Sequence, residues 1–162
     1  YMLIAILKQL INNKHYRGTK MKKIILSVIT VLFSTSLYSA DLEIEMLNKR
    51  KSDKARMVYS IEVAKIDAGQ TIKWVATAKG HNVEMIKGPD GAELPKKSKL
   101  NEEVSIKFDT AGVYLYKCSP HVGLGMIGIV VVGGDTSNKD VIAGVKLSGK
   151  SKKKLKTLLS EI

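Results

Sequence analysis

The chain has 162 residues, enough for one domain, and its 27 Lys and Arg outweigh 15 Asp and Glu, a net charge of +12. Six of these basic residues and no acidic ones precede Asp41, which leaves 21 basic against 15 acidic groups, or +6, in the remainder. The chain has a single tryptophan and no helix-turn-helix or ribonucleoprotein motif, which argues against nucleic-acid binding. The excess of +6 favours docking on acidic proteins instead.

The first 40 residues have the layout of a targeting segment. Met21 opens a positively charged Met-Lys-Lys, an apolar run follows over 24–33, and small and polar residues lead to Ala40. This order is typical of a secretory signal cleaved within a residue or two of Ala40, and the run is too short to span a bilayer as a mature helix. The alternative is a longer natural N-terminus that includes Met2–Ile11.

Beyond Ala40, short apolar runs alternate with turn residues. Leu42, Ile44 and Met46 alternate with acidic residues, which indicates one buried and one solvated face. Turn sequences such as Gly88-Pro89-Asp90-Gly91 separate the runs. Further strands are expected at Met57–Val63, Thr71–Thr77, Glu103–Phe108, Val113–Cys118 and Ile127–Val132. The pattern predicts a mainly β fold, a Greek-key sandwich or barrel.

After Gly134 the apolar residues take up helical spacing. Val141, Ile142 and Val145 follow two candidate caps, Ser137 and Asn138. A second stripe, with intervals of i, i+3, i+4 and i+7, consists of Leu155, Leu158, Leu159 and Ile162. We therefore predict a C-terminal pair of α-helices packed on the sandwich. The predicted organisation is an upstream extension over 1–20, a signal peptide over 21–40, a sandwich over 41–134 and a helical extension over 135–162.

The residues with metal-binding chemistry gather around one short loop. Cys118, the only cysteine of the chain, is followed by Ser-Pro-His121 and then by Val-Gly-Leu-Gly-Met126, between two predicted strands. His81 can reach the same point from a neighbouring strand end. A thiolate, two imidazoles and a weak thioether form the His₂Cys set with axial Met that is typical of a blue-copper site.

Each ligand candidate also has an ordinary explanation when taken alone. A single buried Cys, Met or His belongs more often to a core than to a metal site. Zinc is the competing metal, but structural zinc sites take further Cys or His rather than Met. A multicopper oxidase needs many more histidines than the two after Ala40. A copper-trafficking or storage protein remains the alternative, although such proteins favour exposed, Met- or Cys-rich sites.

The stretch Asp41–Ile162 resembles pseudoazurin, a family of type 1 blue-copper cupredoxins. The matching segments are Met46-Leu47-Asn48-Lys49, Lys79-Gly80-His81-Asn82-Val83-Glu84 and the C-x₂-H-x₄-M loop from Cys118 to Met126. Plastocyanin shares the loop spacing but lacks the helical extension and usually has Tyr where this chain has Lys117. Azurin has a longer Cys-to-His interval, and amicyanin a shorter His-to-Met interval.

The resemblance implies an electron carrier, not an enzyme, that holds one copper ion, Cu(II) or Cu(I), through His81, Cys118, His121 and Met126. It also implies roles for two neighbours of these ligands. Asn82 is expected to hydrogen-bond the cysteine loop and so orient the ligands. Pro120 has no N–H to donate to the Cys118 sulfur, which leaves the thiolate richer in electrons.

The resemblance further implies a docking surface for redox protein partners. An apolar patch of Pro120, Leu124 and Met57 is expected around an exposed ring edge of His121. The lysines expected around it are Lys49, Lys79 and Lys117, with Lys97 less well placed. The implied donor is a c-type cytochrome or a membrane complex, and the implied acceptor is a terminal reductase of denitrification such as copper nitrite reductase. We expect a periplasmic monomer with no stable membrane insertion after signal removal.

Overall fold

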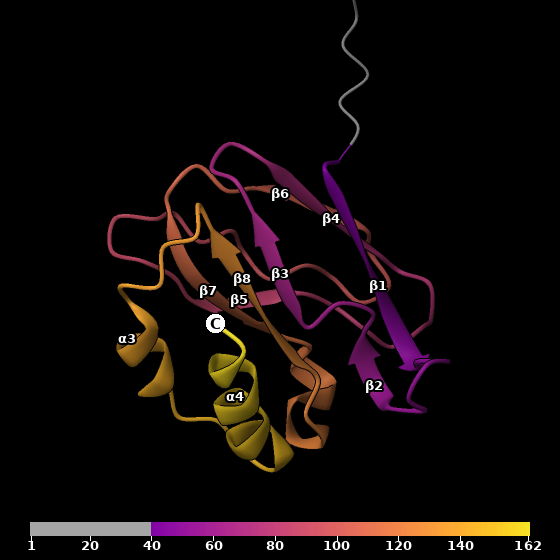
Figure 1. Cartoon of the computed structure of the whole chain (residues 1–162). Coiled ribbons are helices and arrows are strands. Elements are labelled where there is room, and N and C mark those ends of the chain that lie inside the picture. The colour runs from indigo at the N-terminus through magenta and orange to yellow at the C-terminus, as the bar shows by residue number, and fades with distance from the viewer. Residues whose placement is uncertain (1–39) are drawn as a thin grey trace, which may run out of the picture. The chain divides into compact units, whose positions relative to one another are not determined.

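The computed structural model describes residues 40–162, so the predicted extension over 1–20 and the signal peptide up to Ser39 lie outside the described residues. The described part contains two four-stranded sheets, a 3₁₀-helix and two α-helices (Figure 1). The strands are β1 (Leu42–Lys49), β2 (Arg56–Tyr59), β3 (Val63–Ile66), β4 (Thr71–Val75), β5 (Glu84–Lys87), β6 (Val104–Lys107), β7 (Gly112–Lys117) and β8 (Ile127–Val132). The helices are η2 (Ser119–Leu124), α3 (Lys139–Ala143) and α4 (Lys150–Ser160).

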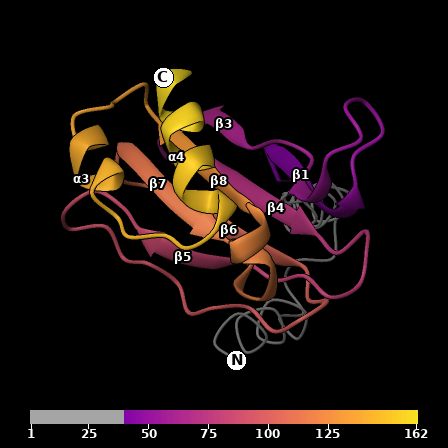
Figure 2. The same ribbon diagram turned by 90° about the horizontal axis from the view of Figure 1, so that it is seen from below.

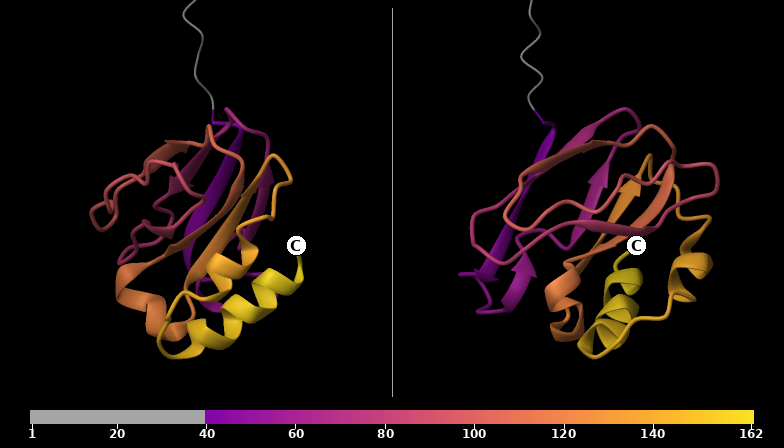
Figure 3. Two further views of the ribbon diagram at one scale, coloured as in Figure 1. Left: turned by 90° about the vertical axis from the view of Figure 1, so that its left-hand side faces the viewer. Right: turned by 180° about the vertical axis from the view of Figure 1, so that it is seen from behind.

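The two sheets have the strand orders β2-β1-β4-β6 and β3-β8-β7-β5. In the first sheet, β1 runs antiparallel to β2 and parallel to β4. In the second, β7 runs antiparallel to β5 and β8, whereas β3 and β8 are parallel. This arrangement confirms the predicted mainly β sandwich with a C-terminal pair of helices (Figure 3).

The central strands β7 and β8 are buried on both faces, which explains why their sequences are almost continuously apolar. Tyr116 and Val130 point into the core between the sheets, with Trp74 of β4. Leu115 and Ile129 point to the opposite face, where the residues Leu155, Leu158 and Leu159 of α4 cover them. Figure 2 shows α4 lying along β8 and beside η2. The helices therefore close the outer face of the second sheet next to the predicted metal-binding loop.

The prediction of one strand over Met57–Val63 is wrong. β2 ends at Tyr59 and pairs with β1, whereas β3 begins at Val63 and pairs with β8 in the other sheet. The chain crosses from one sheet to the other between these two strands. This crossing is a feature of the tertiary structure and leaves no break in the apolar pattern of the sequence. Strand β5 was not predicted, because an irregularity between Met85 and Lys87 interrupts the alternation of its side chains.

The C-terminal helices differ from the prediction at their ends. Helix α3 ends at Ala143, before Val145, and Ile162 lies beyond the end of α4. Asn138 occupies the N-cap position of α3 but makes no side-chain cap hydrogen bond. Its amide instead bonds both backbone groups of Val113 on β7, each at 2.8 Å. Among residues 40–162, no helix is long and apolar enough to cross a membrane.

Candidate metal centre

Three metal-ligating side chains meet at one end of the sandwich. The Nδ1 atoms of His81 and His121 lie 3.2 Å apart, and the Cys118 Sγ lies 3.7 Å from the first and 3.5 Å from the second. His81 and Cys118 are fully buried, and His121 is half-buried. The structure therefore brings together the two histidines and the cysteine that the sequence singles out, although they come from segments 37 residues apart.

The loop between β7 and β8 carries two of these side chains and Met126. Cys118 follows the last residue of β7, His121 lies in η2, and Met126 precedes β8. The loop closes on itself, because Cys118 N–H donates to the Met126 carbonyl at 3.0 Å and Met126 N–H to the His121 carbonyl at 3.2 Å. Met126 is fully buried in the same core cluster as Cys118. Met126, the predicted axial ligand, thus lies where these two hydrogen bonds close the loop.

His81 is held at its ring by Asn48 and at its backbone by Asn101, two residues for which the sequence predicts no role. Its Nε2 lies 2.9 Å from the Asn48 Oδ1, which leaves Nδ1 facing the other two side chains. The Asn101 Oδ1 accepts from Gly80 N–H at 2.6 Å, and Asn101 N–H donates to the His81 carbonyl at 2.8 Å. Asn101 has a φ of +63°, a conformation that Asn tolerates better than most residues. A lone Asn in a loop carries no pattern that reveals this role.

Asn82 joins the His81 segment to the cysteine loop. Its Oδ1 accepts from Ser119 N–H at 2.8 Å, and its Nδ2 donates to the Ser119 Oγ at 3.1 Å. The Ser119 hydroxyl in turn donates to the Glu84 Oε2 at 2.6 Å. This hydrogen bond from Ser119 is the main reason that the pKa of Glu84 is below its ordinary value, helped by the charge of Lys117. The amide thus fixes the residue that follows Cys118.

The electrostatics of the cluster suit a cation. Burial raises the pKa of the Cys118 thiol, although backbone hydrogen bonds from Asn82 and His121 act in the opposite direction. Burial also lowers the pKa of His81, and the charge of His121 lowers it further. Metal ligands must be deprotonated, which the neutral imidazole already satisfies. A buried thiolate needs a positive charge close by, and a metal ion held by the three donor atoms would supply it.

The spacing of the donor atoms also fits a metal. Bonds of about 2.0 Å to nitrogen and about 2.3 Å to sulfur, arranged in a trigonal plane, place neighbouring donor atoms about 3.5 to 3.7 Å apart. The observed separations of 3.2, 3.5 and 3.7 Å lie close to these values. Two imidazoles and one thiolate with a buried thioether in the same loop are the donor types of a blue-copper centre.

The residues predicted to form the docking surface differ in exposure. Lys49, Lys79, Pro120 and Leu124 are exposed, Leu124 by 53%. Lys117 is half-buried, and its Nζ lies 3.5 Å from the Glu84 Oε2, so part of its charge is neutralised locally. Met57 is half-buried and packs against the core cluster that contains Cys118 and Met126.

Comparison with known proteins agrees with this geometry. Residues 45–133 match the family described as copper binding proteins, plastocyanin/azurin family. The chain is 34% identical over 138 residues to a pseudoazurin of Methylorubrum extorquens, covering 84% of this chain and 93% of that protein. It is 36% identical over 127 residues to the pseudoazurin of Paracoccus pantotrophus, covering 77% and 86%.

A solved structure gives the same result for the fold. The pseudoazurin of Sinorhizobium meliloti superposes with a TM-score of 0.70 and 42% identity, over 74% of this chain and 94% of that one. The matches span 86–94% of the length of these relatives. The chain belongs to the plastocyanin/azurin family of copper-binding proteins and, within it, to the pseudoazurins, which are electron carriers rather than enzymes.

Proposed function

We propose that His81, Cys118, His121 and Met126 hold one copper ion and that the chain carries single electrons between redox proteins of the periplasm. The observation that carries this proposal is the cluster of two imidazole nitrogens and one thiol sulfur within 3.7 Å of one another. Bound copper supplies a one-electron Cu(II)/Cu(I) couple. The chain's part is to keep the donor atoms in one arrangement for both oxidation states.

Rigid support of the ligands follows from the contacts around them. Asn48 orients the His81 ring, and Asn82 ties the His81 segment to Ser119, so neither segment moves independently. Pro120 has no N–H to donate to the Cys118 sulfur and stiffens the start of η2. A site that does not rearrange when an electron arrives transfers the electron with a lower reorganisation energy.

Electrons would enter and leave through His121, the ligand that is only half-buried. The exposed Pro120 and Leu124 lie in the same loop and, with Met57, provide an apolar contact surface. The side chains of Lys49, Lys79 and Lys117 add positive charge to it, which attracts acidic faces of partners and speeds encounter at low salt. Lys97 is less well placed for docking, although its charge also helps to lower the pKa of Glu84.

The partners and the location follow from the same proposal. We expect a c-type cytochrome or a membrane complex as donor and a terminal reductase of denitrification, such as copper nitrite reductase, as acceptor. A signal peptide over 21–40, preceded by an extension over 1–20, would direct export and then be removed. The mature protein is then a monomer with the sandwich over 41–134 and the helical extension over 135–162.

Replacement of Met126 by leucine distinguishes an electron carrier from a copper-trafficking protein. In a carrier, the two imidazoles and the thiolate retain the copper, and loss of the thioether changes the reduction potential. We therefore expect Met126→Leu to bind one copper per chain with an altered potential, measured by metal analysis and protein-film voltammetry. Leucine is close in volume to methionine, so the buried position should remain filled.

The trafficking alternative predicts a different result for the same variant. A transfer site that depends on soft sulfur ligands for Cu(I) would lose its copper when Met126 is replaced. Met85→Leu is the matched control, since Met85 is also buried in the core between the sheets but is not one of the proposed ligands. Loss of copper from Met126→Leu, with copper retained in Met85→Leu, would contradict the electron-carrier proposal.

A further inference from the structure

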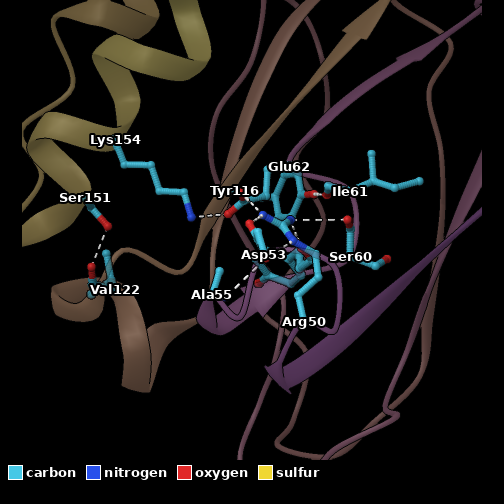
Figure 4. Close-up of polar contacts among 11 residues, drawn as sticks. Arg50, Asp53, Ala55, Ser60, Ile61, Glu62, Tyr116, Val122, Ser151 and Lys154 are labelled. Carbon is cyan, nitrogen blue, oxygen red and sulfur yellow. Dashed lines mark hydrogen bonds and ion pairs between the residues drawn. The ribbon is translucent and has the colours of Figure 1, made fainter.

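The first turn of α4 lies directly against the loop that carries His121 and Met126. Ser151 is fully buried, and its Oγ donates a hydrogen bond to the carbonyl of Val122, the residue after His121 (Figure 4). Just before the helix, the backbone of Gly149 meets that of Gly123: a Cβ on Gly149 would lie only 3.0 Å from the Gly123 Cα. Helix and loop are therefore in backbone contact at this point.

Lys154, one turn further along α4, ties the helix to the sandwich. Its aliphatic stem covers Gly125, the residue before Met126, and its Nζ forms an ion pair with the Glu62 Oε1. The Glu62 side chain is only 13% exposed, and its other oxygen lies 3.2 Å from the Arg50 Nη2. Figure 4 shows this chain of contacts from α4 across Glu62 to Arg50. Residues three apart share one face of a helix, so Ser151 and Lys154 act on the same side.

The loop needs an external restraint. Its helix η2 is a 3₁₀-helix, whose hydrogen bonds have poorer geometry than those of an α-helix. Glycines at 123 and 125 add conformational freedom. The Val122 carbonyl, to which Ser151 donates, also accepts from Gly125 N–H at 3.0 Å and so belongs to the turn between His121 and Met126.

We propose that α4 is a brace for the metal-binding loop and that Ser151 is a positioning residue for His121 and Met126. This inference rests on the proposed ligand set. The Ser151 hydroxyl holds the Val122 carbonyl, and Lys154 holds the helix to Glu62. The C-terminal extension thereby fixes the arrangement of the two ligands that follow Cys118.

The test compares Ser151→Ala with Ser160→Ala in copper-loaded protein purified after expression of the full chain. Ser160 is on the same helix, is exposed, and donates within the helix to the Thr157 carbonyl, so it is a matched control. Loss of one buried hydrogen bond should speed copper loss to a chelator about tenfold in Ser151→Ala, which corresponds to about 1.4 kcal/mol. The thiolate-to-copper absorption should shift as well. Ser160→Ala should match the parent, and Ser151→Thr, which keeps the hydroxyl, should restore parental behaviour.

Two results would overturn the brace. The first is a Ser151→Ala protein with the parent's spectrum and rate of copper loss. The second is an equal loss of melting temperature in the copper-free and copper-loaded forms with an unchanged spectrum, since this is a general effect on stability. A parent protein that lacks the thiolate-to-copper band overturns the proposed function, and the brace with it. A parent with the band and an unaffected Ser151→Ala overturns the brace alone.

Discussion

Asn82→Ala is expected to lower the free energy of unfolding by about 2–4 kcal/mol, because it removes buried hydrogen bonds and leaves their partners unsatisfied. The Asn82 side chain is 3% exposed and bonds Ser119 twice and the Ser98 carbonyl once, the last at 3.3 Å. The variant should also change the visible spectrum of the copper-loaded protein, since Ser119 directly follows Cys118. Denaturant titration and absorption measure the two effects.

Asn138→Ala is the matched control for this variant. Its amide also makes two hydrogen bonds to the backbone, but at Val113, near the start of β7 rather than at the end that leads to Cys118. Asn138→Ala should therefore lower stability and leave the copper spectrum unchanged. An Asn82→Ala protein that loses stability without any spectral change would show that the amide is structural support only.

Reversing the charge of two lysines should slow association with an acidic redox partner by about 10–100-fold at low ionic strength, because steering depends on local charge. The variant is Lys49→Glu combined with Lys79→Glu. Stopped-flow measurement of electron transfer over a series of salt concentrations tests it. The difference from the parent should shrink as salt screens the charges.

The control for charge steering is the double variant Lys65→Glu and Lys156→Glu. Both lysines are exposed, on β3 and α4, and the net charge changes by the same amount. This variant should associate with the partner much faster than Lys49→Glu/Lys79→Glu. Equal slowing by the two variants would mean that overall charge, not a docking surface around His121, governs encounter.

The part of the fold that follows from local pattern could be predicted from the sequence. β8 occupies the predicted range Ile127–Val132, because a strand buried on both faces is continuously apolar between glycine turns. The break between β2 and β3 could not be predicted. The break arises because β2 pairs with β1 and β3 pairs with β8. The local sequence of a strand does not indicate which other strand it pairs with.

In the candidate site, too, some residues could be predicted from the sequence and others could not. The donor residues stand out because the chain has one cysteine and, after Ala40, two histidines. The residues that hold these donors do not stand out. Asn48 lies 33 residues before His81, and Ser151 lies 29 residues after Val122, so the contacts exist only once the chain is folded. Single polar residues with ordinary neighbours give no periodicity or motif from which such roles can be inferred.

The most direct test of the central claim is the visible absorption and electron paramagnetic resonance spectrum of the purified protein after addition of Cu(II). We predict an intense thiolate-to-copper band that ascorbate bleaches reversibly and that is lost in Cys118→Ala. A colourless protein with ordinary tetragonal copper signals, or one that binds Cu(I) alone, would contradict the assignment of His81, Cys118, His121 and Met126 as an electron-transfer site.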